Sequence, residues 1–193
     1  MSDMTQQNSP VQLPAFFDDH PELKEKLEAY LKTVPAEEIK ENVEIFKKYI
    51  NGEITWGEIR KISKRMQKEL ARVAFMKFKM QDYDKAETLF KGLAIIDHTN
   101  WYYRSALGAI YFKLRKYEDA INEYDIAIEL KEDELSCWVN RGECQLFLKD
   151  FEEAIKDFEK VMAMDLAPTN AWYLRAKALM QRTKLAQRED ENG

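Results

Sequence analysis

The segments YDKAETLF (residues 83–90), YEDAINEY (117–124) and FEEAIKDF (151–158) follow one another along the chain at intervals of 34 residues. In each segment an aromatic residue opens the motif, an alanine follows three positions later, and a second aromatic residue closes it. No gap is needed to align the three segments. A period of 34 residues is typical of helix–turn–helix units that stack into an extended array. The sequence therefore predicts a repeat protein built from pairs of helices.

Small residues recur with the same period, and they explain why the helices of one unit can pack closely. Ala86, Ala120 and Ala154 are placed where the second helix of each unit crosses the first, and larger side chains would force the helices beyond the usual spacing of about 8–10 Å. Gly108 and Gly142 repeat on the first helix. This pattern is that of the tetratricopeptide repeat. We therefore expect an all-α fold, a tetratricopeptide-repeat solenoid of three helix–turn–helix repeats with N-terminal helices and a C-terminal capping helix.

The repeat register divides the chain into five regions. We expect a disordered N-terminal tail (1–20), an N-terminal helical region (21–66), three repeats (67–168), a capping helix (169–187) and a disordered C-terminal tail (188–193). The paired helices of the three repeats are expected at residues 67–80 and 84–96, 101–114 and 118–130, and 135–148 and 152–164. A capping box at Thr55 predicts a short helix from Trp56 to Ile62. A final helix is expected at 170–186.

Composition excludes several classes of function. The net charge is −5 and the pI about 5.3, which argues against a general nucleic-acid-binding surface. No apolar run approaches the roughly 20 residues of a membrane helix, and the N-terminus lacks a signal peptide, so we expect a cytoplasmic protein. Cys137 and Cys144 lie seven residues apart on one predicted helix, too far apart for a disulfide, and are read as free packing thiols.

A catalytic function is not indicated by any motif. The chain has two histidines, His20 and His98, on unrelated segments, and it lacks HExxH, CxxC, GxSxG and a phosphate-binding glycine loop. Its carboxylates alternate with lysines along exposed helix faces, as solvated surfaces do. We therefore predict a non-enzymatic protein without a metal site or a cofactor.

The first helix of each repeat lines the concave surface of such arrays, which binds peptide segments of other proteins. A clamp for a terminal carboxylate would need Lys and Asn where this chain has Ala71, Phe75 and Ala106. Aromatic residues alternate instead with small ones, which indicates pockets for the apolar anchors of an extended peptide. Some of these aromatic residues are alternatively part of the inter-repeat core. The candidate peptide-binding residues are Ala71, Phe75, Phe78, Tyr102, Ser105, Ala106, Ala109, Phe112, Ser136, Val139, Asn140 and Glu143.

Residues 43–161 carry a more specific resemblance. The segment INGEITWGEI (50–59), the stretch LFKGL (89–93) with Asp97-His98, and the stretches LGAIY (107–111) and GECQL (142–146) resemble the class II chaperones of bacterial type III secretion systems. The resemblance implies a bacterial cytoplasmic chaperone that binds an extended apolar segment of a secreted translocator protein and keeps it soluble and competent for export. A general bacterial adaptor that assembles a protein complex is the alternative.

The resemblance also implies self-association through the N-terminal helices. An apolar stripe at helical spacing occurs there, and it would serve either a homodimer interface or packing against the first repeat. The stripe consists of Ile39, Val43, Phe46 and Ile50.

Overall fold

The computed structural model describes residues 51–164, 167 and 169–192, together with isolated positions between Glu25 and Tyr49. The chain divides into two units, residues 1–54 and 55–193, and each is considered by itself. Throughout the described residues the regular elements are helices, without a strand, and the predicted all-α repeat fold is confirmed. The expected N-terminal tail, residues 1–20, lies outside the described residues. So do the four residues of the apolar stripe, Ile39, Val43, Phe46 and Ile50.

A glycine ends the last helical segment of the first unit. Gly52 has a φ of +73°, the left-handed conformation that glycine adopts without steric cost. Its N–H donates to the carbonyl of Tyr49 at 3.1 Å, and the N–H of Glu53 donates to the carbonyl of Lys48 at 2.9 Å. This pair of bonds is a Schellman motif, and it satisfies carbonyls that the helix end would leave unpaired.

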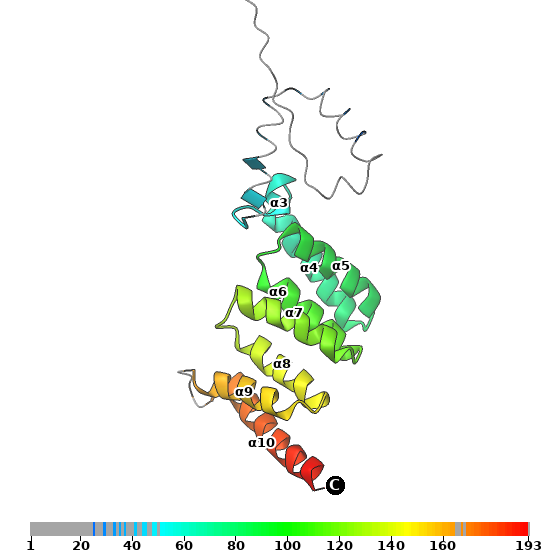
Figure 1. The fold of residues 1–193 in the computed structure, drawn as a ribbon. Coiled ribbons are helices and arrows are strands. Elements are labelled where there is room, and N and C mark those ends of the chain that lie inside the picture. Colours follow the sequence, from blue (N-terminus) through cyan, green and yellow to red (C-terminus); the bar gives the residue numbers. More distant parts are fainter. Residues whose placement is uncertain are drawn as a thin grey trace, which may run out of the picture. The chain divides into compact units, whose positions relative to one another are not determined.

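The helices of the second unit stack in chain order as successive pairs (Figure 1). A short helix, α3 (Trp56–Ile59), precedes them, and its capping box at Thr55 forms as expected. Helix α4 begins three residues earlier than predicted, because the Ser63 side chain caps it by accepting from the Met66 N–H at 3.2 Å. The repeat helices are α4 (Lys64–Lys79), α5 (Tyr83–Ile96), α6 (Trp101–Lys113), α7 (Tyr117–Leu130), α8 (Leu135–Phe147) and α9 (Phe151–Met162).

The turn inside each repeat is built in the same way. Gln81, Arg115 and Lys149, which are again 34 positions apart, have φ values of 61°, 59° and 63°. The residue that follows each of them donates its N–H five residues back, as Lys116 does to the carbonyl of Tyr111 at 2.9 Å. A left-handed residue at this point closes the first helix and reverses the chain into the second. The turn thus repeats without the glycine that such a position usually carries.

The recurring glycines admit aromatic rings from the second helix of the same repeat. A Cβ placed on Gly108 would lie 2.8 Å from two ring carbons of Tyr124, and one on Gly142 would lie 2.7 Å from the ring of Phe158. Both rings are fully buried. The glycines are therefore required for close packing, as the sequence indicated. Phe90, the equivalent aromatic residue of the first repeat, also contacts the next repeat at Tyr102 and Tyr103.

The last helix, α10 (Ala171–Glu191), packs on α8 and α9 and covers the end of the array. It continues past the predicted end at residue 186, and residues 188–191, expected to be a disordered tail, are helical. Thr183, which is fully buried, anchors the helix before this extension. Within the extension, Asp190 forms an exposed ion pair with Lys149 of the preceding repeat at 2.5 Å.

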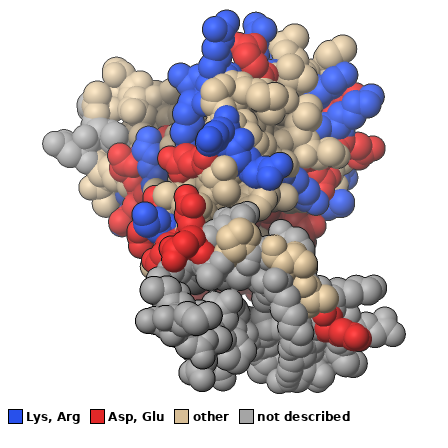
Figure 2. Space-filling model, turned by 90° about the horizontal axis from the view of Figure 1, so that it is seen from above, with Lys and Arg blue, Asp and Glu red and all other residues tan. Residues whose placement is uncertain are grey.

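On the face seen in Figure 2, basic and acidic side chains lie close together. This arrangement agrees with the alternation of Lys with Asp and Glu in the sequence. Among the described residues, no helix combines the length and apolar character needed to cross a membrane.

Candidate functional site

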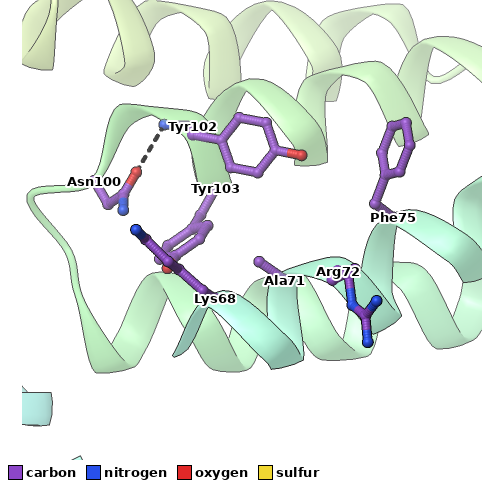
Figure 3. Close-up of a pocket in the computed structure, with 7 residues that line it drawn as sticks. All are labelled: Lys68, Ala71, Arg72, Phe75, Asn100, Tyr102 and Tyr103. Atoms are coloured by element: carbon purple, nitrogen blue, oxygen red, sulfur yellow. Dashed lines mark hydrogen bonds between the residues drawn. The ribbon is translucent and has the colours of Figure 1, made fainter. Parts of the chain in front are cut away.

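Two adjoining cavities lie between α4 and α6, and both are bounded by Phe75 and Tyr102. The first cavity has a volume of about 430 Å³ (Figure 3). It is lined by Lys68, Ala71, Arg72, Phe75, Asn100, Tyr102 and Tyr103. The second has a volume of about 100 Å³ and is lined by Phe75, Phe78, Phe90, Tyr102, Ser105 and Ala106. We call the two cavities together the aromatic groove.

The two shared aromatic residues remain accessible to a ligand. Phe75 is 43% exposed and Tyr102 is 38% exposed, although both are large and apolar. Each is nevertheless held by neighbouring rings. Phe75 stacks against Phe78 with 6.4 Å between ring centroids, and Tyr102 meets Phe90 edge-on at 6.1 Å. An accessible ring in a fixed position is suited to contact an apolar side chain without a large loss of conformational entropy.

Local caps and small residues shape the groove. The Asn100 side chain accepts a hydrogen bond from the Tyr102 N–H at 3.1 Å, which begins α6 and fixes where Tyr102 leaves the helix (Figure 3). Ala71 lies on the floor of the first cavity and Ala106 in the wall of the second. Their methyl groups leave the space that larger side chains would fill.

The charged residues at the groove are all basic. Lys68 extends along the mouth of the first cavity towards Asn100, whereas the Arg72 guanidinium turns outward and pairs with Glu69 at 3.1 Å (Figure 3). The ammonium of Lys79 lies 5.9 Å from the centroid of the Phe75 ring. Burial raises the pKa of the Tyr102 and Tyr103 phenols, so both stay neutral near pH 7. Among the described residues, no Asp or Glu lines either cavity.

Half of the candidate residues from the sequence come together in the aromatic groove. They are Ala71, Phe75, Phe78, Tyr102, Ser105 and Ala106. Ala109 and Phe112 line neither cavity. Phe112 packs instead against Tyr117 and Phe147, with ring centroids 5.7 and 5.6 Å apart.

The four candidates on α8 have surroundings that differ from those of the groove residues. Val139 is fully buried in the core shared by α8, α9 and α10, so a peptide cannot reach it without rearrangement. Glu143 is bound by Arg175 of α10. The Ser136 hydroxyl donates to the Glu134 carboxylate at 2.8 Å, and Asn140 is half-buried. None of these four lines the aromatic groove.

Five lining residues were absent from the sequence-based set: Lys68, Arg72, Phe90, Asn100 and Tyr103. The repeat register places Lys68 and Arg72 on the concave face of the first helix together with Phe75, so the sequence contains a signal for them. Phe90 closes the first repeated motif, and that position does not indicate contact with the groove. Nothing in the sequence separates the cap Asn100 or the buried Tyr103 from other helix-start residues.

The two cysteines are unsuited to nucleophilic chemistry. Cys137 and Cys144 are free and buried, as expected, and burial raises the pKa of Cys144 to about 12. A thiol with this pKa stays protonated and is a poor nucleophile near pH 7. Within the described part of the chain, no three His, Cys, Asp or Glu side chains gather as a metal site would require.

A family model of the tetratricopeptide repeat matches residues 103–134 and 135–168. The chain carries tetratricopeptide repeats. Among curated relatives it is 33% identical over 88 residues to DnaJ homolog subfamily C member 7 of Mus musculus, spanning 44% of this chain but only 18% of that protein. It is 28% identical over 137 residues to chaperone protein SicA of Salmonella dublin, spanning 71% of this chain and 81% of SicA.

Solved structures of type III secretion proteins have the same fold. PcrH in complex with the chaperone binding region of PopD is 25% identical with a TM-score of 0.62, covering 65% of this chain and 96% of PcrH. A type III secretion complex from Aeromonas hydrophila is 21% identical with a TM-score of 0.70, covering 74% and 97%. The similarity to translocator chaperones that the sequence indicated is confirmed.

Proposed function

We propose that this protein is a non-enzymatic chaperone whose aromatic groove binds an extended apolar segment of a secreted translocator protein. The observation that carries the proposal is the pair Phe75 and Tyr102, accessible, held by neighbouring rings and shared by two adjoining cavities. Successive anchors of an extended chain would occupy the two cavities, with small side chains passing between the rings. PcrH, the similar protein solved with the chaperone binding region of PopD, supports the same class of client.

The proposal places the protein in the bacterial cytoplasm, where the client is held before export. Apolar segments of a translocator would otherwise aggregate or insert into a membrane too early. Binding requires no nucleotide, because burial of the client's apolar side chains supplies the free energy. A homodimer formed through Ile39, Val43, Phe46 and Ile50 is part of the proposal, and light scattering of wild type and Phe46→Glu would test it separately.

Co-expression tests the chaperone function. A candidate translocator is produced alone, with the wild-type protein, and with a variant carrying Phe75→Ala and Tyr102→Ala. We expect the client to stay in the soluble fraction only with the wild type, without added ATP. The control carries Ile95→Ala and Leu185→Ala, because these apolar side chains are 62% and 60% exposed and lie outside both cavities. A client equally soluble under all conditions would contradict the proposal.

The second candidate function is an adaptor that assembles folded proteins. Its support is that the repeats are also similar to segments of proteins that are not named as secretion chaperones, DnaJ homolog subfamily C member 7 and RNA polymerase II-associated protein 3 of Xenopus tropicalis, the latter 30% identical over 89 residues. An adaptor would join two folded partners and leave their solubility unchanged. Pull-down with mass spectrometry separates the two functions, because a chaperone retains a single aggregation-prone client and an adaptor retains a stable set.

A further inference from the structure

The aromatic groove combines apolar cavities with a wholly basic set of charged residues. We infer that the client segment carries an acidic side chain two residues from an apolar anchor, and that Lys68 and Arg72 bind this carboxylate. The inference rests on the proposed function and specifies the chemistry of its client. It concerns an internal Asp or Glu rather than a chain terminus.

The charged residues at the groove have the opposite sign to the net charge of the whole protein. The chain has a net charge of −5, yet both charged residues that line the first cavity are cations, and Lys79 beside Phe75 is a third. Among the described residues, Lys68 forms no ion pair, and the pair between Arg72 and Glu69 is exposed on both sides, at 76% and 60%. An exposed pair of this kind contributes about 0–1 kcal/mol, so Arg72 can exchange Glu69 for a ligand carboxylate at little cost.

The positions of the cavities set the spacing of the client's residues. The cavities adjoin at Phe75 and Tyr102, and the cations line only the first of them. The second is lined by aromatic residues together with Ser105 and Ala106, and it has space for an aliphatic side chain. In an extended chain, residues advance by about 3.3 Å each and successive side chains point to opposite sides, so neighbouring cavities take side chains that are two residues apart in sequence. An apolar residue in the second cavity thus brings the side chain two residues away within reach of Lys68.

A terminal-carboxylate clamp does not explain these cations. Lys and Asn would be required at the positions of Ala71, Phe75 and Ala106, which form the apolar walls of the groove instead. Lys68 lies at the mouth, where the side chain of a passing peptide would meet it (Figure 3). Recognition of a side-chain carboxylate therefore fits the geometry better than capture of a chain end.

A peptide library tests the inference. Short synthetic peptides of random sequence, acetylated and amidated so that they carry no terminal charge, are selected on the wild-type protein and on Lys68→Glu/Arg72→Glu. We expect the wild type to enrich Asp or Glu two residues from Leu, Ile, Val or Pro, and the variant to enrich Lys or Arg two residues from the same apolar residues. Replacing the carboxylate of an enriched peptide by its amide should weaken binding to the wild type roughly two- to fivefold. This difference should shrink as the salt concentration rises.

The controls separate the inference from the proposed function. Lys85→Glu/Lys156→Glu changes the net charge equally, at lysines that are 67% and 63% exposed outside the groove, and should leave the preference unchanged. Lys68→Gln/Arg72→Gln should remove the acidic preference without reversing it. Apolar peptides enriched with no acidic preference, or a preference unaltered by charge reversal, would overturn the inference and leave the proposed function intact. No enrichment of apolar peptides would overturn both.

Discussion

Arg141 holds the carboxylate of Asp157 with two hydrogen bonds, from Nε to Oδ2 at 2.8 Å and from Nη2 to Oδ1 at 2.6 Å. Its remaining nitrogen, Nη1, donates to Asp125 at 2.5 Å. The three residues lie 16 positions apart, on α7, α8 and α9 in turn. One guanidinium thereby joins the second repeat to both helices of the third. Burial raises the pKa of Asp157, and the contact with Arg141 opposes that rise.

Removing Arg141 should destabilise the protein strongly. Asp157 is only 5% exposed, so Arg141→Met would leave a buried carboxylate without a partner, at a cost of about 3–5 kcal/mol in the free energy of unfolding. The double variant Arg141→Met/Asp157→Leu should recover much of this loss. Lys156→Met, which breaks an exposed ion pair with Glu153, is the control and should cost less than about 1 kcal/mol. Urea denaturation measures all three, and equal losses for Arg141→Met and the control would contradict the prediction.

The glycines provide a matched pair of substitutions. Gly142→Ala would place a methyl group 2.7 Å from the Phe158 ring and 3.2 Å from the Ala154 carbonyl, and it should destabilise the fold by about 1–3 kcal/mol. Gly92→Ala in α5 meets no atom within 4 Å and should stabilise by about 0.5–1 kcal/mol, because alanine favours the helix. Thermal melts distinguish the two. A rise in Tm for Gly142→Ala would show that the helix crossing is looser than described.

Asp97 should make stability depend on pH in the acid range. Burial raises the pKa of Asp97, but hydrogen bonds from Lys64 and Thr99 outweigh it, and the folded-state pKa is lower than the ordinary value of 3.8. The ionised Asp97 carboxylate therefore contributes its full stabilisation of the fold above about pH 4–5, and this contribution is lost as the pH falls through the lower, folded-state pKa. The stability difference between wild type and Asp97→Asn should be larger at pH 7 than near pH 2. Chemical denaturation at both pH values measures it, and a constant difference would rule out this role.

The fold followed from the sequence more fully than the site did. The 34-residue period places each repeat helix because small residues and aromatic rings recur at the helix crossings, as Gly108 and Tyr124 do. The same period shows which face of a helix a residue lies on, but it does not show which other helices cover that face. Val139 has a groove position in the register, yet neighbouring helices bury it, and Phe112 turns to Phe147. Contacts between non-equivalent residues, such as Lys149 with Asp190, have no periodic signal.

Ala106 offers the most direct test of where the client binds. Its methyl group lines the second cavity among Phe75, Phe90 and Tyr102, and it is half-buried on α6. Ala106→Glu would fill the cavity and place a carboxylate among aromatic rings, where it cannot be solvated well. Loss of an anchor pocket should weaken client binding by about 1–3 kcal/mol, roughly ten- to a hundredfold, and the buried charge should add to this. Ala106→Ser is the matched control, since it keeps nearly the same volume and should change affinity much less. Calorimetry with a client peptide, on variants whose circular dichroism matches wild type, measures the effect. If folded Ala106→Glu binds the client with full affinity, the client binds outside the aromatic groove.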